Sequence, residues 1–187
     1  MAKANLKSFD DLFKSSEQQE KTNGISSLPI SKLQPFSKHP FKRHNAEKMQ
    51  ELADSIEERG IIVPILVRPL ENGMYEIVAG HNRVEASTLA GKADIPCDVR
   101  EMDDDTAIIM MVDSNLQRET VLPSEKAWAY RYKLEAIRRK TGRKQNGVQV
   151  DTHLKGIKSK DIVADENGES AATIQRYVRL THLMPQL

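Results

Sequence analysis

Residues 61–83 read IIVPILVRPLENGMYEIVAGHNR, and this stretch decides the fold of the first half of the chain. Two apolar runs, Ile61–Arg68 and Met74–Ala79, lie on either side of the turn residues Glu71-Asn72-Gly73, a pattern that predicts two buried strands joined as a hairpin. Gly80 ends the second strand, and Arg83–Leu89 predicts a short helix. Strand, turn, strand and helix in so short a span indicate a compact α/β unit.

The flanking segments extend this unit on both sides. Ile25–Leu33 predicts one more strand and Ile95–Val99 another, while Gly91 can close the short helix. A further helix is indicated by an apolar face that ends before Gly60: Met49, Leu52, Ala53 and Ile56. We therefore expect a small domain over residues 25–101, preceded by a polar, mobile tail at residues 1–24.

Residues 102–187 have a helical pattern. Asp103, Asp104 and Asp105 suit the positive N-terminal end of a helix. Pro123 suits the first position of a second helix, whose apolar face is Ala127, Tyr130, Leu134 and Ile137. On this helix Glu125 and Lys126 are expected to face solvent, and residues 143–156, which have no apolar period, predict an exposed loop.

The last 30 residues have the layout of a helix-turn-helix, over about residues 157–183. Ser159 can cap the first helix, Gly168 permits a tight turn, and Ser170 can cap the second helix. The shared core is expected to consist of Ile162, Val163, Ile174, Val178 and Leu180. The remaining side chains suit base edges and phosphates, so the candidate DNA-binding residues are Ser170, Ala172, Thr173, Gln175, Arg176 and Arg179. A helical hairpin without a ligand is the alternative.

Composition narrows the class of protein. With 39% hydrophobic and 29% charged residues the chain is expected to fold, and no apolar run approaches the roughly 18 residues that span a bilayer, so we expect a cytoplasmic protein without a membrane partner. The single cysteine, Cys97, excludes an intramolecular disulfide and is expected to be a buried strand residue. The net charge is +1, but basic residues crowd the C-terminal third, where charge alone leaves open a nucleic-acid contact or a solvated linker.

The turn at Gly80 is a candidate phosphate-binding loop. A strand that ends in Val78-Ala79-Gly80 and passes at once into a helix places backbone N–H groups where an anion can bind, and Arg83 can add a charged fork. Ordinary turn chemistry is the alternative for a glycine in this position. A second polar cluster, Ser114–Glu119, interrupts an apolar helix, so its polar groups must be solvated, engaged by a ligand or part of a helix end.

These two segments together resemble the ParB family of chromosome and plasmid partition proteins, which bind cytidine triphosphate (CTP). The family's Gly-Glu-Arg-Arg motif corresponds to Gly80-His81-Asn82-Arg83, and its Glu-Asn-Leu-Gln-Arg motif to residues 114–118. Pro64–Arg68 and Tyr75–Gly80 are similar to the family's central strands. The resemblance covers about residues 25–187 and implies an α+β fold: a small mixed-sheet domain like that of ParB and sulfiredoxin, followed by an all-helical domain with the helix-turn-helix.

The resemblance also implies the ligands and their residues. CTP would be bound with Mg²⁺, to which Asn115 would contribute. The nucleotide-binding residues implied are Gly80, His81, Asn82, Arg83, Ser114, Asn115, Arg118, Phe41 and Lys42. Ser114 stands where the family usually carries a Glu that helps to hold magnesium, and His39-Pro40-Phe41-Lys42 stands for a Gln-Pro-Arg loop tied to hydrolysis. Because Asp113 points about 100° away from Ser114 on a helix, it need not substitute. We therefore hypothesise that nucleotide binding persists and that hydrolysis is weak, altered or absent.

The family further implies partners and alternatives. Its members recognise a palindromic partition site in double-stranded DNA, close as a sliding homodimeric clamp, and engage a ParA-type ATPase through an N-terminal segment. Here that segment would be Leu6, Phe9, Leu12 and Phe13. The family's C-terminal dimerisation region would lie beyond Leu187. A transcriptional regulator or nucleoid-occlusion factor is the main alternative. A sulfiredoxin-like enzyme is a weaker one, because that reaction needs a reactive Cys that the Gly80–Arg83 loop does not contain. A nuclease would need more clustered acidic residues for its metal than the three at 103–105.

Overall fold

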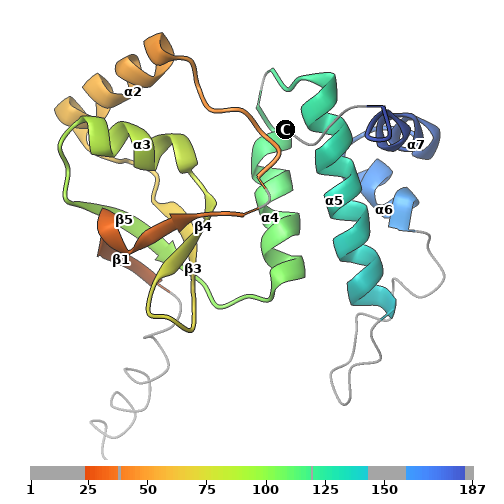
Figure 1. Cartoon of the computed structure of the whole chain (residues 1–187), viewed down its shortest axis with the longest axis horizontal. Coiled ribbons are helices and arrows are strands. Elements are labelled where there is room, and N and C mark those ends of the chain that lie inside the picture. Colours follow the sequence, from red (N-terminus) through yellow and green to blue (C-terminus); the bar gives the residue numbers. More distant parts are fainter. Residues whose placement is uncertain (1–23, 38, 119, 143–158, 184–187) are drawn as a thin grey trace, which may run out of the picture. The chain divides into compact units, whose positions relative to one another are not determined.

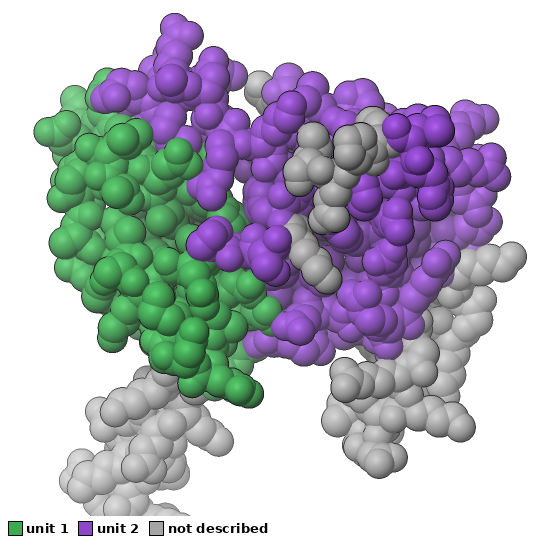
Figure 2. Space-filling view, in the orientation of Figure 1, with its two compact units in different colours: residues 1–34, 52–101 green, residues 35–51, 102–187 purple. Residues whose placement is uncertain are grey.

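The computed structural model describes residues 24–37, 39–118, 120–142 and 159–183. The predictions for the N-terminal tail and for the loop at 143–156 lie outside these residues. Contacts divide the chain into two units, one of residues 1–34 and 52–101 and one of residues 35–51 and 102–187 (Figure 2). Residues 35–51, which the sequence assigned to the α/β domain, thus group with the helices. We describe each unit by itself.

The first unit is built on a five-stranded mixed sheet. Its strands are β1 (Gly24–Pro29), β2 (Leu33–Pro35), β3 (Ile65–Pro69), β4 (Tyr75–Ala79) and β5 (Asp94–Val99), with the 3-10 helix η1 (Ile30–Lys32) between the first two. The strand order is β1-β5-β3-β4-β2. β5 pairs antiparallel with β1 and parallel with β3, and β3 pairs antiparallel with β4. The expected hairpin and mixed sheet are therefore confirmed.

The centre of this sheet is fully apolar. Ile65, Val67, Ile95 and Cys97 are each at most 1% exposed. Burial raises the pKa of the Cys97 thiol to about 11, which agrees with a structural cysteine rather than a nucleophile. The predicted strand from Ile61 was wrong at its start, because the chain becomes a strand only at Ile65.

The four residues before β3 form a loop, for a reason visible in their backbone. Pro64 has no N–H to give to a ladder, and Arg83 donates hydrogen bonds to the carbonyls of Val63 and Pro64, the second at 2.9 Å. Ile62 and Val63 are 81% and 63% exposed as a result.

Two helices accompany the sheet in the sequence. α2 (Ala46–Arg59) buries Met49, Ala53 and Ile56, and it ends at Gly60, which has a φ of +71°. α3 (His81–Leu89) follows β4 directly and lies against the sheet (Figure 1). Both helices were expected, although α3 begins two residues earlier than predicted.

Besides the first residues of α2, the second unit contains four helices among its described residues: α4 (Asp104–Leu116), α5 (Pro123–Gly142), α6 (Ser159–Glu166) and α7 (Ala171–Leu180). α5 packs against the other three, with α4 on one side and α6 and α7 on the other (Figure 1). Asp103 caps α4, because its carboxylate accepts the Thr106 N–H at 2.7 Å.

The core of this unit lies where α5, α6 and α7 meet. Its buried members are Tyr130, Leu134, Ile137, Val163, Ala164 and Ile174, with Ile162, Tyr177 and Val178 packed against them. The predicted shared core is confirmed for Val163 and Ile174, which are 0% exposed. One prediction on α5 was wrong: Glu125 is only 6% exposed instead of facing solvent, because its carboxylate binds two backbone N–H groups.

A membrane-spanning helix, long and apolar enough to cross a bilayer, is not found in the part of the chain that the structure describes.

Candidate functional site

The glycine of the candidate phosphate loop is required by its surroundings. Gly80 has a φ of +101° and stands as the N-cap of α3. A Cβ at this position would lie 2.7 Å from Cγ2 of Ile65, a buried strand residue, and 3.3 Å from Cζ of Arg83. Only glycine combines this backbone angle with so close an approach. The chain therefore turns from β4 into α3 without a spacer, and the first-turn N–H groups of α3 lie directly behind the turn.

Arg83 is held by the first unit's own backbone. One guanidinium nitrogen, Nη1, donates to the carbonyls of Val63 and Pro64. Burial lowers the pKa of this guanidinium. A phosphate contact, as predicted for Arg83, would use the donors on Nε and Nη2, which remain of the five N–H donors of a guanidinium. His81 and Asn82 are 3% and 8% exposed, so the loop presents little side chain beyond Arg83.

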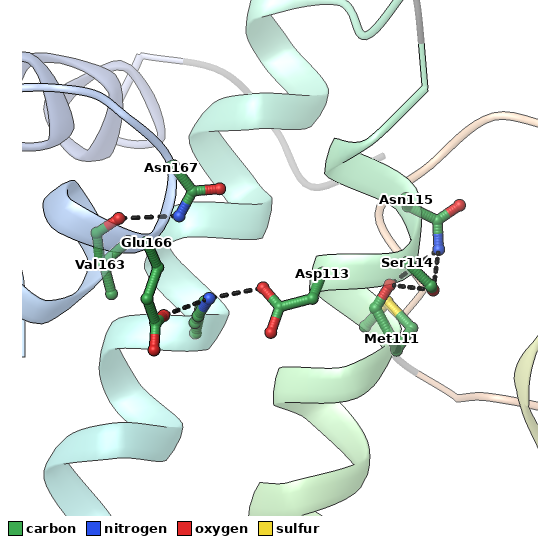
Figure 3. A network of polar contacts seen from close by, with 8 residues as sticks. Met111, Asp113, Ser114, Asn115, Val163, Glu166 and Asn167 are labelled. Carbon is green, nitrogen blue, oxygen red and sulfur yellow. Dashed lines mark hydrogen bonds and ion pairs between the residues drawn. The ribbon is translucent and has the colours of Figure 1, made fainter.

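The second motif begins in the last turn of α4 and continues past the end of the helix at Leu116. Ser114 donates its hydroxyl to the Met111 carbonyl at 2.9 Å, and the Asn115 amide nitrogen donates to the same carbonyl at 2.8 Å (Figure 3). These bonds fix the Asn115 amide so that its oxygen points away from Met111. Ser114 is exposed whereas Asn115 is only 3% exposed. The segment thus offers one oriented amide oxygen at the end of a helix.

Asp113 is engaged elsewhere. Its carboxylate pairs with Lys133 of α5, and the same ammonium pairs with Glu166 of α6 at 2.6 Å (Figure 3). We call these three residues the Lys133 cluster. It lines a cavity of about 440 Å³ with Leu116, Gln117 and Asn167. Asp113 therefore does not stand in for the family's glutamate at position 114.

The loop at residues 39–42 contacts the end of the same motif within the second unit. The Arg118 guanidinium lies 5.8 Å from the centre of the buried Phe41 ring. Burial lowers the pKa of Arg118, and the nearby charge of Glu125 acts in the opposite direction. Two segments that the sequence proposed separately, the loop and the motif, are therefore brought together here.

His39 is neutral in this loop. Nδ1 donates to the Phe41 carbonyl at 3.0 Å, and burial lowers the pKa of His39 to about 4. The rings of His39 and Phe41 meet edge to face with centroids 5.6 Å apart. At neutral pH this histidine carries no positive charge, so the loop offers a phosphate only the exposed Lys42 ammonium and the backbone.

The two C-terminal helices, α6 and α7, are joined by a short turn at residues 167–170. Gly168 adopts a φ of +64° in the turn, and Ser170 caps α7 by accepting the Thr173 N–H at 3.1 Å. Ile174 is fully buried, whereas the proposed DNA contacts Ala172, Gln175, Arg176 and Arg179 are exposed. Ser170 and Thr173 are engaged with each other, through hydroxyls 2.9 Å apart.

Two residues with evident roles escaped the sequence reading. Lys133 stands on the buried face of α5, three residues after Tyr130 and next to Leu134, and an ionisable residue in that register could have suggested a buried ion pair. Glu125 follows Leu122 by three residues, the spacing of a capping box, in which a glutamate turns back to the helix start.

A cluster of metal ligands is not found in the part of the chain that the structure describes: no group of three or more His, Cys, Asp or Glu side chains there is arranged to hold a metal ion.

A small mixed α/β unit joined to a helical unit that ends in a helix, a tight turn and a capped helix defines an α+β class of protein. The ParB N-terminal domain family matches residues 14–116, which is more than half of the 187 residues, and the chain belongs to that family.

Relatives and a solved structure agree with this assignment. The chromosome-partitioning protein Spo0J of Thermus thermophilus is 36% identical over 155 residues, which are 80% of this chain and 57% of that protein. A nucleoid occlusion protein of Geobacillus sp. is 40% identical over 120 residues, 64% of this chain and 42% of that protein. The crystal structure of C-terminally truncated ParB from Caulobacter crescentus, complexed to the centromeric parS site, is similar with a TM-score of 0.55 and 27% identity, over 86% of this chain and 73% of that one. The chain spans about half the length of the two curated relatives.

Proposed function

We propose that this chain is a CTP-dependent, sequence-specific DNA-binding clamp of the ParB type that acts in chromosome or plasmid segregation. The observation that carries the proposal is α7. It is capped at Ser170 and anchored by Ile174, and it exposes Gln175, Arg176 and Arg179 in a chain of the ParB family. Glutamine and arginine are the side chains that read base edges and phosphates. The relative solved with parS DNA supports the same role.

The DNA-binding half is tested by a matched pair of arginine variants. Arg176→Ala should weaken binding to a palindromic partition site by about 1–3 kcal/mol, the worth of one good contact to a base. Arg59→Ala removes the same charge from α2, where the exposed guanidinium pairs with the adjacent Glu58, and should change binding little. Competition binding at fixed salt measures both. Equal losses in the two variants would show nonspecific charge attraction in place of recognition by α7.

The nucleotide half of the proposal rests on the sequence motifs and on the loop geometry. CTP would be bound by Gly80, His81, Asn82 and Arg83 together with Ser114, Asn115, Arg118, Phe41 and Lys42. The packing of Arg118 on the Phe41 ring supports a common role for the loop at residues 39–42 and the motif at residues 114–118, which both belong to the second unit. Arg83→Ala should abolish nucleotide binding and leave DNA-site binding near normal. Loss of both activities would indicate misfolding, since Arg83 also holds the carbonyls of Val63 and Pro64.

Mg²⁺ would accompany the triphosphate. This ion binds few protein oxygens beside substrate phosphates and water, and the fixed amide oxygen of Asn115 fits such a ligand. A carboxylate is missing at position 114, so we propose that hydrolysis is weak. Ser114→Glu, at an exposed position, should raise the rate of CTP hydrolysis. Vigorous turnover by the unaltered protein, or no gain in the variant, would contradict this part of the proposal.

The remaining partners follow from the same proposal. The chain would work as a homodimer associated with the nucleoid, and its residues 1–24 would engage a ParA-type ATPase. Deleting residues 1–20 should abolish stimulation of the cognate ATPase and spare DNA binding. Unchanged stimulation would reject this assignment.

A nucleoid-occlusion or regulatory role is the second candidate, favoured by the 40% identity to the Geobacillus protein. It predicts the same clamp on differently distributed DNA sites. Mapping the chain's binding sites on the host DNA separates the two roles: clustered sites near one locus support segregation, and dispersed sites support the alternative.

A further inference from the structure

Glu125 joins two segments that are 83 residues apart in the chain. One carboxylate oxygen accepts the Lys42 N–H at 2.8 Å, and the other accepts the Leu122 N–H at 3.0 Å. The Leu122 bond belongs to the start of α5, where a glutamate three residues into the helix satisfies a free backbone donor. The Lys42 bond has no such local purpose, because Lys42 lies in the loop at residues 39–42.

The carboxylate is well placed to hold this loop. Glu125 is 6% exposed, so water competes little for its oxygens, and hydrogen bonds from N–H groups to a charged acceptor are stronger than neutral ones. Fixing the Lys42 backbone also fixes the preceding residue, Phe41, whose buried ring lies against the Arg118 guanidinium. Glu125 thus connects the loop, Arg118 and the start of α5 at one point.

From this geometry we propose that Glu125 is a positioning residue for nucleotide binding: its carboxylate holds the loop at residues 39–42 against Arg118. It does not touch the nucleotide itself. The inference rests on the proposed function, because the loop and Arg118 are assigned there to CTP. Without the carboxylate the Lys42 N–H has no fixed acceptor. The free-energy cost of ordering the loop would then reduce the affinity for the nucleotide.

The test uses the full chain and two variants that each remove one negative charge from α5. Glu125→Gln keeps the size of the side chain but replaces one accepting oxygen by an NH₂ group, so only one of the two N–H bonds can remain. Glu135→Gln is the matched control, because Glu135 is half-exposed and pairs with Arg131 one turn earlier. Labelled CTP and labelled partition-site DNA are titrated separately.

We expect Glu125→Gln to weaken CTP binding about tenfold, the effect of one charge-assisted hydrogen bond, while DNA-site binding stays within twofold. Glu135→Gln should leave both affinities within twofold. If Glu125→Gln binds CTP as tightly as the unaltered chain, or if Glu135→Gln weakens CTP equally, the inference is overturned. If the unaltered chain binds no CTP, the proposed function itself fails, which is a different result.

Amide hydrogen exchange supplies a readout that helix capping alone would not move. In Glu125→Gln the exchange of the Lys42 amide should rise about tenfold above its rate in the unaltered chain, as expected for the loss of one such bond. This comparison needs no nucleotide. A Lys42 amide that exchanges at the same rate in Glu125→Gln as in the unaltered chain would overturn the inference.

Discussion

The Lys133 cluster predicts an asymmetry between removing its base and removing its acids. The Lys133 side chain is 1% exposed, whereas those of Asp113 and Glu166 are 41% and 49% exposed. The variant Asp113→Asn/Glu166→Gln would leave a buried ammonium without a charged partner. That situation costs about 3–5 kcal/mol, because the lysine loses both of its charged partners while its side chain stays 1% exposed.

The opposite variant should be far milder. Lys133→Met keeps most of the volume and leaves two carboxylates that already reach solvent, so its cost should be about 1 kcal/mol or less. The two variants therefore differ by about 3 kcal/mol, which corresponds to a shift of about 1.5 M in the urea midpoint at an m-value of about 2 kcal/mol/M.

Urea unfolding followed by tryptophan fluorescence measures this difference. Trp128, the only tryptophan of the chain, is 8% exposed and stands on α5 of the same unit. Adding Lys133→Met to the double variant should restore most of the lost stability. If Lys133→Met proves as destabilising as the double variant, or if no restoration is seen, the reasoning about the buried ammonium is refuted.

Three further changes have expected outcomes. The pKa of His39 is lowered from 6.5 to about 4, so between these pH values the unfolded chain binds a proton more readily than the folded chain. The contribution of His39 to the free energy of unfolding should therefore be full above pH 6.5 and fall by up to about 3 kcal/mol towards pH 4. In urea melts at stepped pH, His39→Gln should flatten this slope. Gly80→Ala should cost about 3 kcal/mol or more in the same melts, since its Cβ would meet Ile65 at 2.7 Å in a backbone conformation unsuited to alanine; a loss below about 1 kcal/mol would contradict the geometry. Ser170→Ala should lower the unfolding free energy by about 1 kcal/mol through the lost cap of α7, and Ser170→Asp should recover it; equal stability of all three proteins would deny the cap.

The sequence predicted those parts of the fold that depend on local signals. The turn at residues 71–73, the stop at Gly60 and the caps at Asp103 and Ser170 all act within a few residues, so their patterns are legible without a structure. The prediction that Ile61–Pro64 belong to a strand was wrong because their conformation depends on a residue far away in the sequence. The apolar residues of this segment favour a strand, but Pro64 and the hydrogen bonds from the Arg83 side chain, which is distant in the sequence, hold the segment as a loop.

The candidate site was predictable only in its parts. Motif spacing identified Gly80–Arg83 and residues 114–118, yet it did not show that Arg83 binds backbone carbonyls or that Asp113 is paired with Lys133. Nor could it place Glu125, since a glutamate on a helix is normally solvated, and its burial depends on an N–H group 83 residues away. Long-range hydrogen bonds of this kind leave no period in the sequence.

The central claim is that this member of the ParB family binds CTP. Its most direct test is a titration of the purified chain with labelled CTP and labelled ATP, each with and without Mg²⁺, in the presence of its partition-site DNA. We expect saturable binding of CTP that Mg²⁺ strengthens, no comparable binding of ATP, and loss of CTP binding in Arg83→Ala. Equal binding of both nucleotides, or of neither, would contradict it.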